Sequence, residues 1–401
     1  MHRSSVLRLV ASILIGVTTG LVVLALEHSV DDILHEILEA PAWVPAVTII
    51  VGAIATAALV HYIGGGSSST TDVYVEEFHR DESDLESKHV PGRLLAALTT
   101  LGSGAPLGME GPAVYSGTAI AAVVHRKWRA LGPDAYHALM VAGAAAGIAA
   151  VFKAPAAGAI FALEVPFRGR LAGERVLPAI FGSAAGYLTM ASLDGVKPEL
   201  EVPLIELSYG RVAFSLLLGV VVGVAAIGVI RLIGAAEHSA HRWPLWGRAV
   251  GAGIVLAAFY LIGREVADAP LALTSGNSVI DWAVDGDHAL WVLVVVFLLR
   301  AAGPAVSIAG AGVGGLFIPL MAAGAVLGRL FAEASNTQEL ALYVVVGAAC
   351  MLGAGYAVPL TGIVFVAEYT GQATVIVPAL IAMTAATLVV GDRSVCPAQQ
   401  R

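Results

Sequence analysis

One acidic residue lies between two apolar segments, in the stretch GSGAPLGMEGPAVYSG at residues 102–117. A charge at membrane depth costs roughly 2.5–3.5 kcal/mol, so such a residue is usually paired, protonated or functional. This residue, Glu110, is followed by Gly111 and Pro112. Glycine lets a backbone approach a ligand closely, and proline is preferred in the first turn of a helix. We therefore expect a helix to begin near Pro112, and its free N–H groups and partial positive charge make an anion site.

Two roles are open to Glu110 at such a helix start. Its carboxylate can act as an internal anion, which competes with a permeating anion until it is protonated or swings away. The simpler alternative is a glutamate that only caps the first turn of its own helix. The other motifs of the chain bear on this choice.

The glycine–proline pattern around Glu110 occurs a second time. Gly108 and Pro112 in GMEGP recur 207 residues later as Gly315 and Pro319 in GLFIP. The second copy lacks the acid but keeps the residues that favour a free helix N-terminus. In a membrane protein, interrupted segments at matching positions of two halves point to a substrate site between the halves.

A second repeated element supports duplicated halves. FKAPAAGAIFALE at 152–164 recurs 204 residues later as YAVPLTGIVFVAE at 356–368. We therefore divide the chain into a first membrane half at 1–195, a connecting segment at 196–208 and a second membrane half at 209–401.

Composition places both halves in a membrane. Charged residues make up 13% of the chain, against roughly 25% in soluble domains. Runs such as 6–26, 211–230 and 373–391 carry at most one charge each, and about 20 mostly apolar residues span a bilayer. We expect roughly ten or more membrane segments, several of them too short to cross alone. The net charge of −8 lies mostly in acidic loops and argues against nucleic acid as a partner.

Backbone amides and hydroxyl groups offer further anion ligands. In GVGGLFIPL at 312–320, the glycines leave the N–H groups of Leu316 and Phe317 free to face an anion. The stretch GGGSSSTTD at 64–72 adds hydroxyls and amides that suit a halide. It is equally compatible with a polar loop between helices.

These motifs resemble those of the CLC family of chloride channels and proton-coupled chloride antiporters. GMEGPAVYSG resembles the family's G(K/R)EGP motif, which carries the gating glutamate, and GGLFIP resembles its GxFxP motif. VAGAAAGIAAVFKAPAAGAIFALE resembles the block between them. PLTGIVFVAEYTG and GDRSVCPAQ resemble the last helices and the terminal motif. The matches follow the family's order from about residue 60 to 400.

The resemblance implies an all-α integral membrane protein, multi-pass in the plasma or inner membrane, that transports chloride or a related anion. The implied fold is an inverted-topology repeat of tilted, partly incomplete transmembrane helices. It further implies a homodimer in the lipid bilayer with one anion pathway per subunit, no cofactor, no metal and no enzymatic activity. The length corresponds to the membrane domain alone, without the regulatory domain that some members append.

Position by position, Glu110 matches the external gating glutamate, and Leu316 and Phe317 match the amides that coordinate chloride. The serine of the family's first motif, GSGIP, falls near Ser68, 42 residues before Glu110. The literal GSGAP at 102–106 is too close to the gate for that role. The expected anion-binding residues are Ser68, Gly111, Leu316, Phe317 and Cys396, and the motif residues are Gly108, Pro112, Gly315 and Pro319.

Three departures from the family bear on mechanism. Met109 replaces the usual Lys or Arg beside the gate, which leaves the local field less favourable to anions. Proton-coupled members studied as models carry a second glutamate one position after the match to Glu164, and here that position is Val165. The family's terminal tyrosine falls at Cys396, and a thiol is a shorter and weaker donor than a phenol. These residues favour a channel or weakly coupled transport, with chloride–proton antiport as the alternative.

Glu164 and Glu368 each close the second repeated element of their half. As proton carriers they would need access to water. The alternative role is structural, with each carboxylate paired at a helix end to Arg168 or to a backbone group.

Two other functional classes were weighed against anion transport. A cation-coupled solute carrier needs carboxylates or carbonyl-rich breaks at both repeat sites, and only one site has an acid. An intramembrane enzyme needs a motif such as His-Glu-x-x-His, or Gly-x-Ser-x-Gly with a buried histidine, and the sequence supplies neither. Anion selectivity stays open, although GMEGP and GLFIP follow the chloride pattern rather than the fluoride-selective one.

Overall fold

The computed structural model describes residues 3–65, 68, 70–80, 85–128, 131–132, 135–196, 199–200, 202–205, 208–240, 242–337 and 339–400. Over these ranges the regular structure is helical, with two isolated β-bridges. The helices are α1 (Arg3–Glu39), α2 (Trp43–Tyr62), α3 (Thr71–Phe78), α4 (Val90–Gly102), α5 (Glu110–Lys127), α6 (Ala135–Phe152), α7 (Pro155–Glu164), α8 (Val176–Asp194), α9 (Tyr209–Ala240), α10 (Leu245–Ala267), α11 (Asn277–Val284), α12 (Leu290–Ala309), α13 (Phe317–Ala334), α14 (Leu340–Gly355), α15 (Pro359–Thr370) and α16 (Ile376–Val390). Short 3₁₀ turns are η1 (Ser87–His89), η3 (Gly173–Arg175) and η4 (Ala373–Val375).

Nine helices formed by the described residues are long and apolar enough to cross a membrane. By contrast, α7 has 10 residues and α14 has 16, fewer than the roughly 20 that a span needs. Large apolar side chains are exposed along the outer helices α1, α9 and α10. The chain is therefore an all-α, multi-pass integral membrane protein with some incomplete helices, as the sequence predicts.

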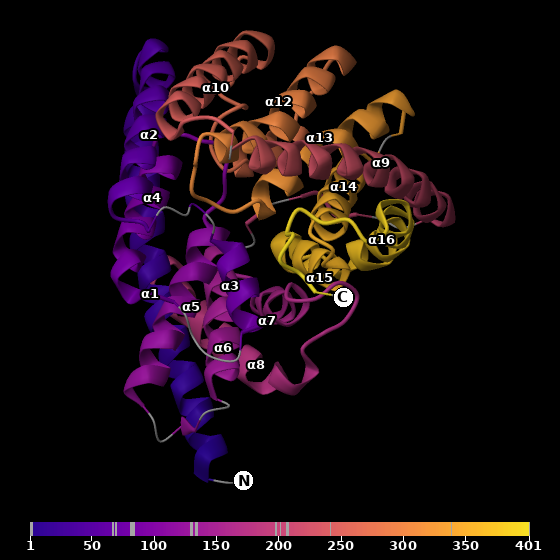
Figure 1. Cartoon of the computed structure of the whole chain (residues 1–401). Coiled ribbons are helices and arrows are strands. Elements are labelled where there is room, and N and C mark those ends of the chain that lie inside the picture. Colours follow the sequence, from indigo (N-terminus) through magenta and orange to yellow (C-terminus); the bar gives the residue numbers. More distant parts are fainter. Residues whose placement is uncertain are drawn as a thin grey trace.

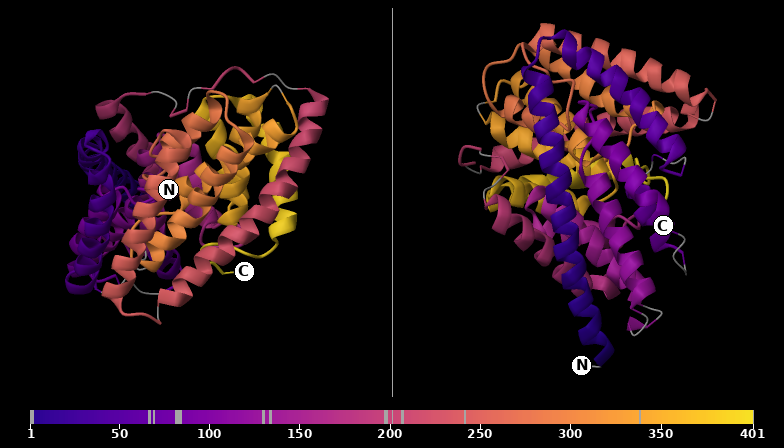
Figure 2. Two further views of the ribbon diagram at one scale, coloured as in Figure 1. Left: turned by 90° about the horizontal axis from the view of Figure 1, so that it is seen from above. Right: turned by 90° about the vertical axis from the view of Figure 1, so that its left-hand side faces the viewer.

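The same succession of elements occurs before and after the segment that joins α8 to α9. A long helix opens each half (α1 and α9), and a packed helix pair follows later (α5 with α6, α13 with α14). Each half then has a short helix (α7, α15), a 3₁₀ turn (η3, η4) and a closing helix (α8, α16). In Figure 1, α5 to α8 lie together in the lower part of the molecule, while α9 and α12 to α14 lie above them. Figure 2 shows α1 running along one side of the molecule from the N-terminus.

Facing glycines bring the helices of each packed pair into close contact. A Cβ on Gly117 of α5 would collide with the carbonyl of Gly143 on α6. Gly324 on α13 and Gly347 on α14 are related in the same way. Small residues at helix contacts let backbones approach closely, which drives helix association where lipid replaces water. The start of α5 and the start of α13 are thus each supported by a tightly packed partner.

Gly143→Ala should lower the thermal stability of the purified protein, because the added methyl group has no room against the Gly117 carbonyl. Overpacking of this kind costs about 1–3 kcal/mol. Gly251→Ala on α10 is the matched control. Nothing lies within 4 Å of a Cβ at that position, and alanine is favoured over glycine in a helix by roughly 0.5–1 kcal/mol. Thermal unfolding in detergent checks both variants, and equal midpoints would contradict the close contact.

Candidate functional site

The two glycine–proline loops of the sequence repeat touch each other in the interior. The N–H of Gly108 donates to the carbonyl of Gly315 at 2.9 Å, and the N–H of Gly315 donates to the carbonyl of Gly108 at 2.7 Å. This reciprocal pair joins the N-terminus of α5 to the N-terminus of α13. Matching positions of the two motifs are therefore in direct contact.

Glu110 is buried where these two helices begin. Its Oε1 accepts a hydrogen bond from the N–H of Phe317, the first residue of α13. The residue is 1% exposed, and its Oε2 has no hydrogen-bond partner among the described residues. The carboxylate thus binds a free N–H group of a helix other than its own, a position that also suits an external anion.

Glycines leave room for this carboxylate. A Cβ at Gly315 would overlap Oε1 of Glu110, and a Cβ at Gly108 would overlap Oε2. A Cβ at Gly111 would collide with the hydroxyl oxygen of Thr70 and with the N–H of Gly315. The three glycines therefore form a slot that only a backbone without side chains can provide.

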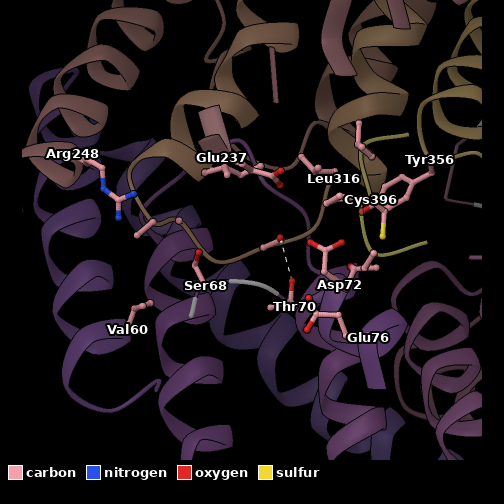
Figure 3. Close-up of a pocket in the computed structure, with 18 of the residues that line it drawn as sticks. Val60, Ser68, Thr70, Asp72, Glu76, Glu237, Arg248, Leu316, Tyr356 and Cys396 are labelled. Carbon is pink, nitrogen blue, oxygen red and sulfur yellow. Dashed lines mark hydrogen bonds between the residues drawn. The ribbon is translucent and has the colours of Figure 1, made fainter. Parts of the chain in front are cut away.

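A large cavity of about 1120 Å³ lies on one side of the slot (Figure 3). Leu316, Tyr356 and Cys396 line its wall next to the start of α13. Ionisable side chains of both signs share the remaining wall: His61, Asp72, Glu76, His79, Arg80, Glu237 and Arg248. This cavity brings titratable groups close to the proposed anion ligands.

A small pocket of about 90 Å³ lies beside the starts of α5 and α13. Met109 and Ile318 form part of its wall. The charged residues among the described ones that line it are all acidic: Glu27, Asp31 and Glu199. The two spaces near the slot therefore differ greatly in size and in the charge of their linings.

Ser68 and Thr70 both line the large cavity, at different places. In Figure 3, Thr70 stands between Ser68 and Leu316. The hydroxyl of Thr70 donates to the carbonyl of Gly314 at 3.3 Å. The hydroxyl of Thr70 is thus nearer to the start of α13 than that of Ser68. The sequence did not indicate Thr70. Five hydroxyl residues follow one another in this stretch, so spacing alone separated them poorly.

Glu164 and Glu368 cap each other's helices. Glu164 accepts hydrogen bonds from the N–H groups of Leu360 and Thr361 at 3.0 and 2.8 Å, at the start of α15. The Thr361 hydroxyl adds a third bond at 2.7 Å. Glu368 on α15 accepts bonds from the N–H groups of residues 156–157 at 2.9 and 2.7 Å, at the start of α7. Carboxylates satisfy the free N–H groups there, as the structural alternative requires.

Val165 is buried, and a histidine lies close to it. The carbonyl of the next residue, Pro166, is 2.8 Å from Nε2 of His79. His79 also lines the large cavity. The position that carries an acid in model antiporters is therefore apolar here. The imidazole of His79 contacts the backbone of the residue that follows it.

Cys396 lies at the cavity wall, and Tyr356 lies beside it. Sequence analysis did not identify Tyr356 as a ligand. A signal was nonetheless present, because its match in the first half of the repeat is Phe152. The second half has gained a hydroxyl group at this position.

A family model described as voltage gated chloride channel matches residues 51–391. The chain belongs to the CLC family. The match includes both glycine–proline motifs, the elements of α7 and α15, and most of the described helices. The resemblance drawn from the sequence motifs is confirmed.

Similar proteins of known name are H(+)/Cl(−) exchange transporters called ClcA. Those of Salmonella paratyphi A, Salmonella typhimurium and Citrobacter koseri are each 29% identical to this chain over 318 residues. The alignments cover 75% of this chain and 65% of each relative. The chain thus spans just under two thirds of the length of these relatives.

Solved structures of the family share the fold. A slow cyanobacterial Cl⁻/H⁺ antiporter has a TM-score of 0.86 at 21% identity, with 98% of this chain and 96% of that chain covered. A CLC-type fluoride/proton antiporter has a TM-score of 0.87 at 19% identity, with both chains fully covered. A eukaryotic CLC transporter has a TM-score of 0.80 at 20% identity, covering 98% and 74%. The CLC-type architecture predicted from the sequence is confirmed.

Glu164→Gln and Thr361→Val should both destabilise the protein by weakening the cap of α15. The first removes a charged acceptor of three bonds and should cost about 1–3 kcal/mol, and the second removes one hydroxyl bond worth about 1 kcal/mol. Thermal unfolding in detergent measures both effects. An unchanged midpoint for Glu164→Gln, together with altered proton movement in liposomes, would instead identify a proton carrier.

Proposed function

We propose that this chain exchanges chloride for protons across the membrane and that Glu110 is the gate of its anion path. The observation that carries the proposal is the hydrogen bond from the N–H of Phe317 to the Glu110 carboxylate. That carboxylate occupies a position suited to an anion, and residues next to it line a cavity of about 1120 Å³ and a pocket of about 90 Å³. The names of the ClcA relatives support exchange as the activity.

Protonation of one carboxylate links the two ions in this proposal. Ionised Glu110 is held by charge-assisted bonds to the start of α13 and blocks the path. Protonated Glu110 no longer makes charge-assisted bonds to α13, so its side chain leaves the slot more readily. A chloride ion can then approach Gly111 and the N–H groups of Leu316 and Phe317. The same side chain thus takes up a proton and gives way to an anion, which is the minimum that exchange requires.

Antiport is preferred here to the channel or weakly coupled behaviour that Val165 and Cys396 suggested. The named relatives are exchangers, and they include chains from two genera. Because Val165 carries no acid, protons need another route to the slot. The large cavity offers titratable groups for that purpose, among them His79, which contacts the carbonyl of Pro166 next to Val165.

The same proposal includes the architecture around the path. The repeated order of elements supports two inverted halves at 1–195 and 209–401, joined by 196–208, which lies partly outside the described residues. The contact between Gly108 and Gly315, and the exchange of caps between α7 and α15, fit such a pseudo-symmetric relation. A homodimer in the bilayer, chloride as the substrate anion and the absence of a cofactor are proposed from family membership.

The experiment that tests exchange is a chloride efflux assay on liposomes that hold the purified protein, with external pH recorded at the same time. An outward chloride gradient should drive protons into the liposomes against their own gradient. Chloride efflux without proton movement would indicate a channel or an uncoupled carrier and would overturn antiport. No chloride efflux at all would overturn anion transport.

Glu110→Gln should keep chloride efflux and abolish its pH dependence, because the amide mimics the protonated gate and cannot titrate. In the unmodified protein, efflux should rise as pH falls, since protonation releases the carboxylate from α13. In the variant, efflux should vary by less than about twofold from about pH 5 to 8, and proton movement should cease. Glu265→Gln, an exposed acid on α10, is the control and should behave as the unmodified protein. Retained pH dependence in Glu110→Gln would contradict the gate.

A further inference from the structure

Tyr356 is held beside Cys396 by the C-terminal segment. The N–H of Val395 donates to the carbonyl of Gly355 at 2.9 Å. The side chain of Gln399 donates to the carbonyl of Tyr356, also at 2.9 Å. These two bonds lie on either side of Tyr356 and Cys396. They fix the position of the C-terminal segment relative to the end of α14. The phenol and the thiol consequently reach the same wall of the large cavity.

The phenol group of Tyr356 is directed at the start of α13. The ring of Phe161 packs against it edge to face, with 6.2 Å between centroids. The side chain of Thr71 lies near its oxygen. In Figure 3, the side chain extends into the cavity between Leu316 and Asp72. A phenolic oxygen can accept one hydrogen bond and donate another, so the contact with Thr71 leaves a bond available for a ligand.

The thiol of Cys396 is used differently. The side chain of Asp72 lies near it. A carboxylate can accept the thiol proton, which competes with donation to an anion. A thiol is also a weak donor, on a side chain much shorter than a phenol. Cys396 is therefore a poor replacement for a tyrosine as an anion ligand.

We propose that the hydroxyl group of Tyr356 is the side-chain donor to the permeating anion at the large-cavity end of the path, the role that Cys396 cannot fill. The inference rests on the anion transport proposed above. The anion lies between this hydroxyl and the N–H of Leu316, before it reaches the slot of Glu110. The donor thus comes from the end of α14 instead of from the terminal motif.

Packing alone does not account for this hydroxyl. The matching residue of the first half, Phe152, stacks on Phe317 with 4.9 Å between ring centroids and has no polar atom. A phenylalanine at position 356 would keep the edge-to-face contact with Phe161. The hydroxyl is the chemical difference between the two positions, and it is directed into the cavity. A ligand role uses that difference.

The test is calorimetric titration of sodium chloride into the purified protein in detergent, at one pH and with isethionate as the starting anion. Tyr356→Phe should weaken chloride binding roughly three- to tenfold, the effect of losing one neutral hydrogen bond. Tyr343→Phe is the matched control, because Tyr343 is also a buried tyrosine, on α14 itself, but packs against Phe214 and Phe331. Tyr343→Phe and Cys396→Ala should each stay within about twofold of the unmodified protein. Thermal unfolding should show that all three variants remain folded.

Three other results of this titration would contradict the inference. Chloride binding by the unmodified protein, with no change in Tyr356→Phe, would overturn this inference and leave the proposed transport intact. A loss in Cys396→Ala at least as large as that in Tyr356→Phe would assign the donor to the thiol and also overturn it. No chloride binding by the unmodified protein and by Glu110→Gln would overturn the proposed anion transport together with this inference.

Discussion

The pathway depends on two peptide units that bind each other. Gly108 and Gly315 exchange backbone hydrogen bonds, so neither loop can shift without breaking two buried bonds. This constraint fixes the N-termini of α5 and α13 next to each other, and their partial positive charges converge on one slot. Glu110 fills the slot with a negative charge. The glycine contacts of α5 with α6 and of α13 with α14 hold both helix starts in place, so the proposed anion site is a consequence of backbone packing.

A second exchange between the halves follows the same logic. Glu164 at the end of α7 accepts hydrogen bonds from the free N–H groups at the start of α15. Glu368 on α15 does the same for the start of α7. Each short helix therefore receives its N-terminal cap from the other half of the chain. In a bilayer interior, unsatisfied N–H groups cost several kcal/mol, so an incomplete helix needs such a partner. The two halves thus complete each other at two places, through backbone groups in one and through carboxylates in the other.

The sequence predicted much of this arrangement, and its limits have physical causes. It placed a helix start near Pro112, and α5 begins at Glu110, two residues earlier. It related Gly108 to Gly315 as equivalent positions, but equivalence does not imply contact, which only the packed halves create. Thr70 was missed because the choice among neighbouring hydroxyls depends on the path of the loop before α3. Tyr356 was missed because its neighbour Cys396 is brought to it by tertiary hydrogen bonds.

The charges around the slot bear on which ion the protein favours. The proposed anion ligands are neutral dipoles, namely the amides at the start of α13 and the hydroxyl of Tyr356, and neutral donors hold an anion weakly enough to release it. The small pocket next to the slot presents Glu27, Asp31 and Glu199 among the residues that line it, with Met109 where a cation stands in relatives. Glu199 is paired with Lys153 at 3.2 Å, so the negative charge of this pocket is partly balanced. Carboxyl groups at this place can hold protons near Glu110, which suits the proposed exchange better than a fast channel.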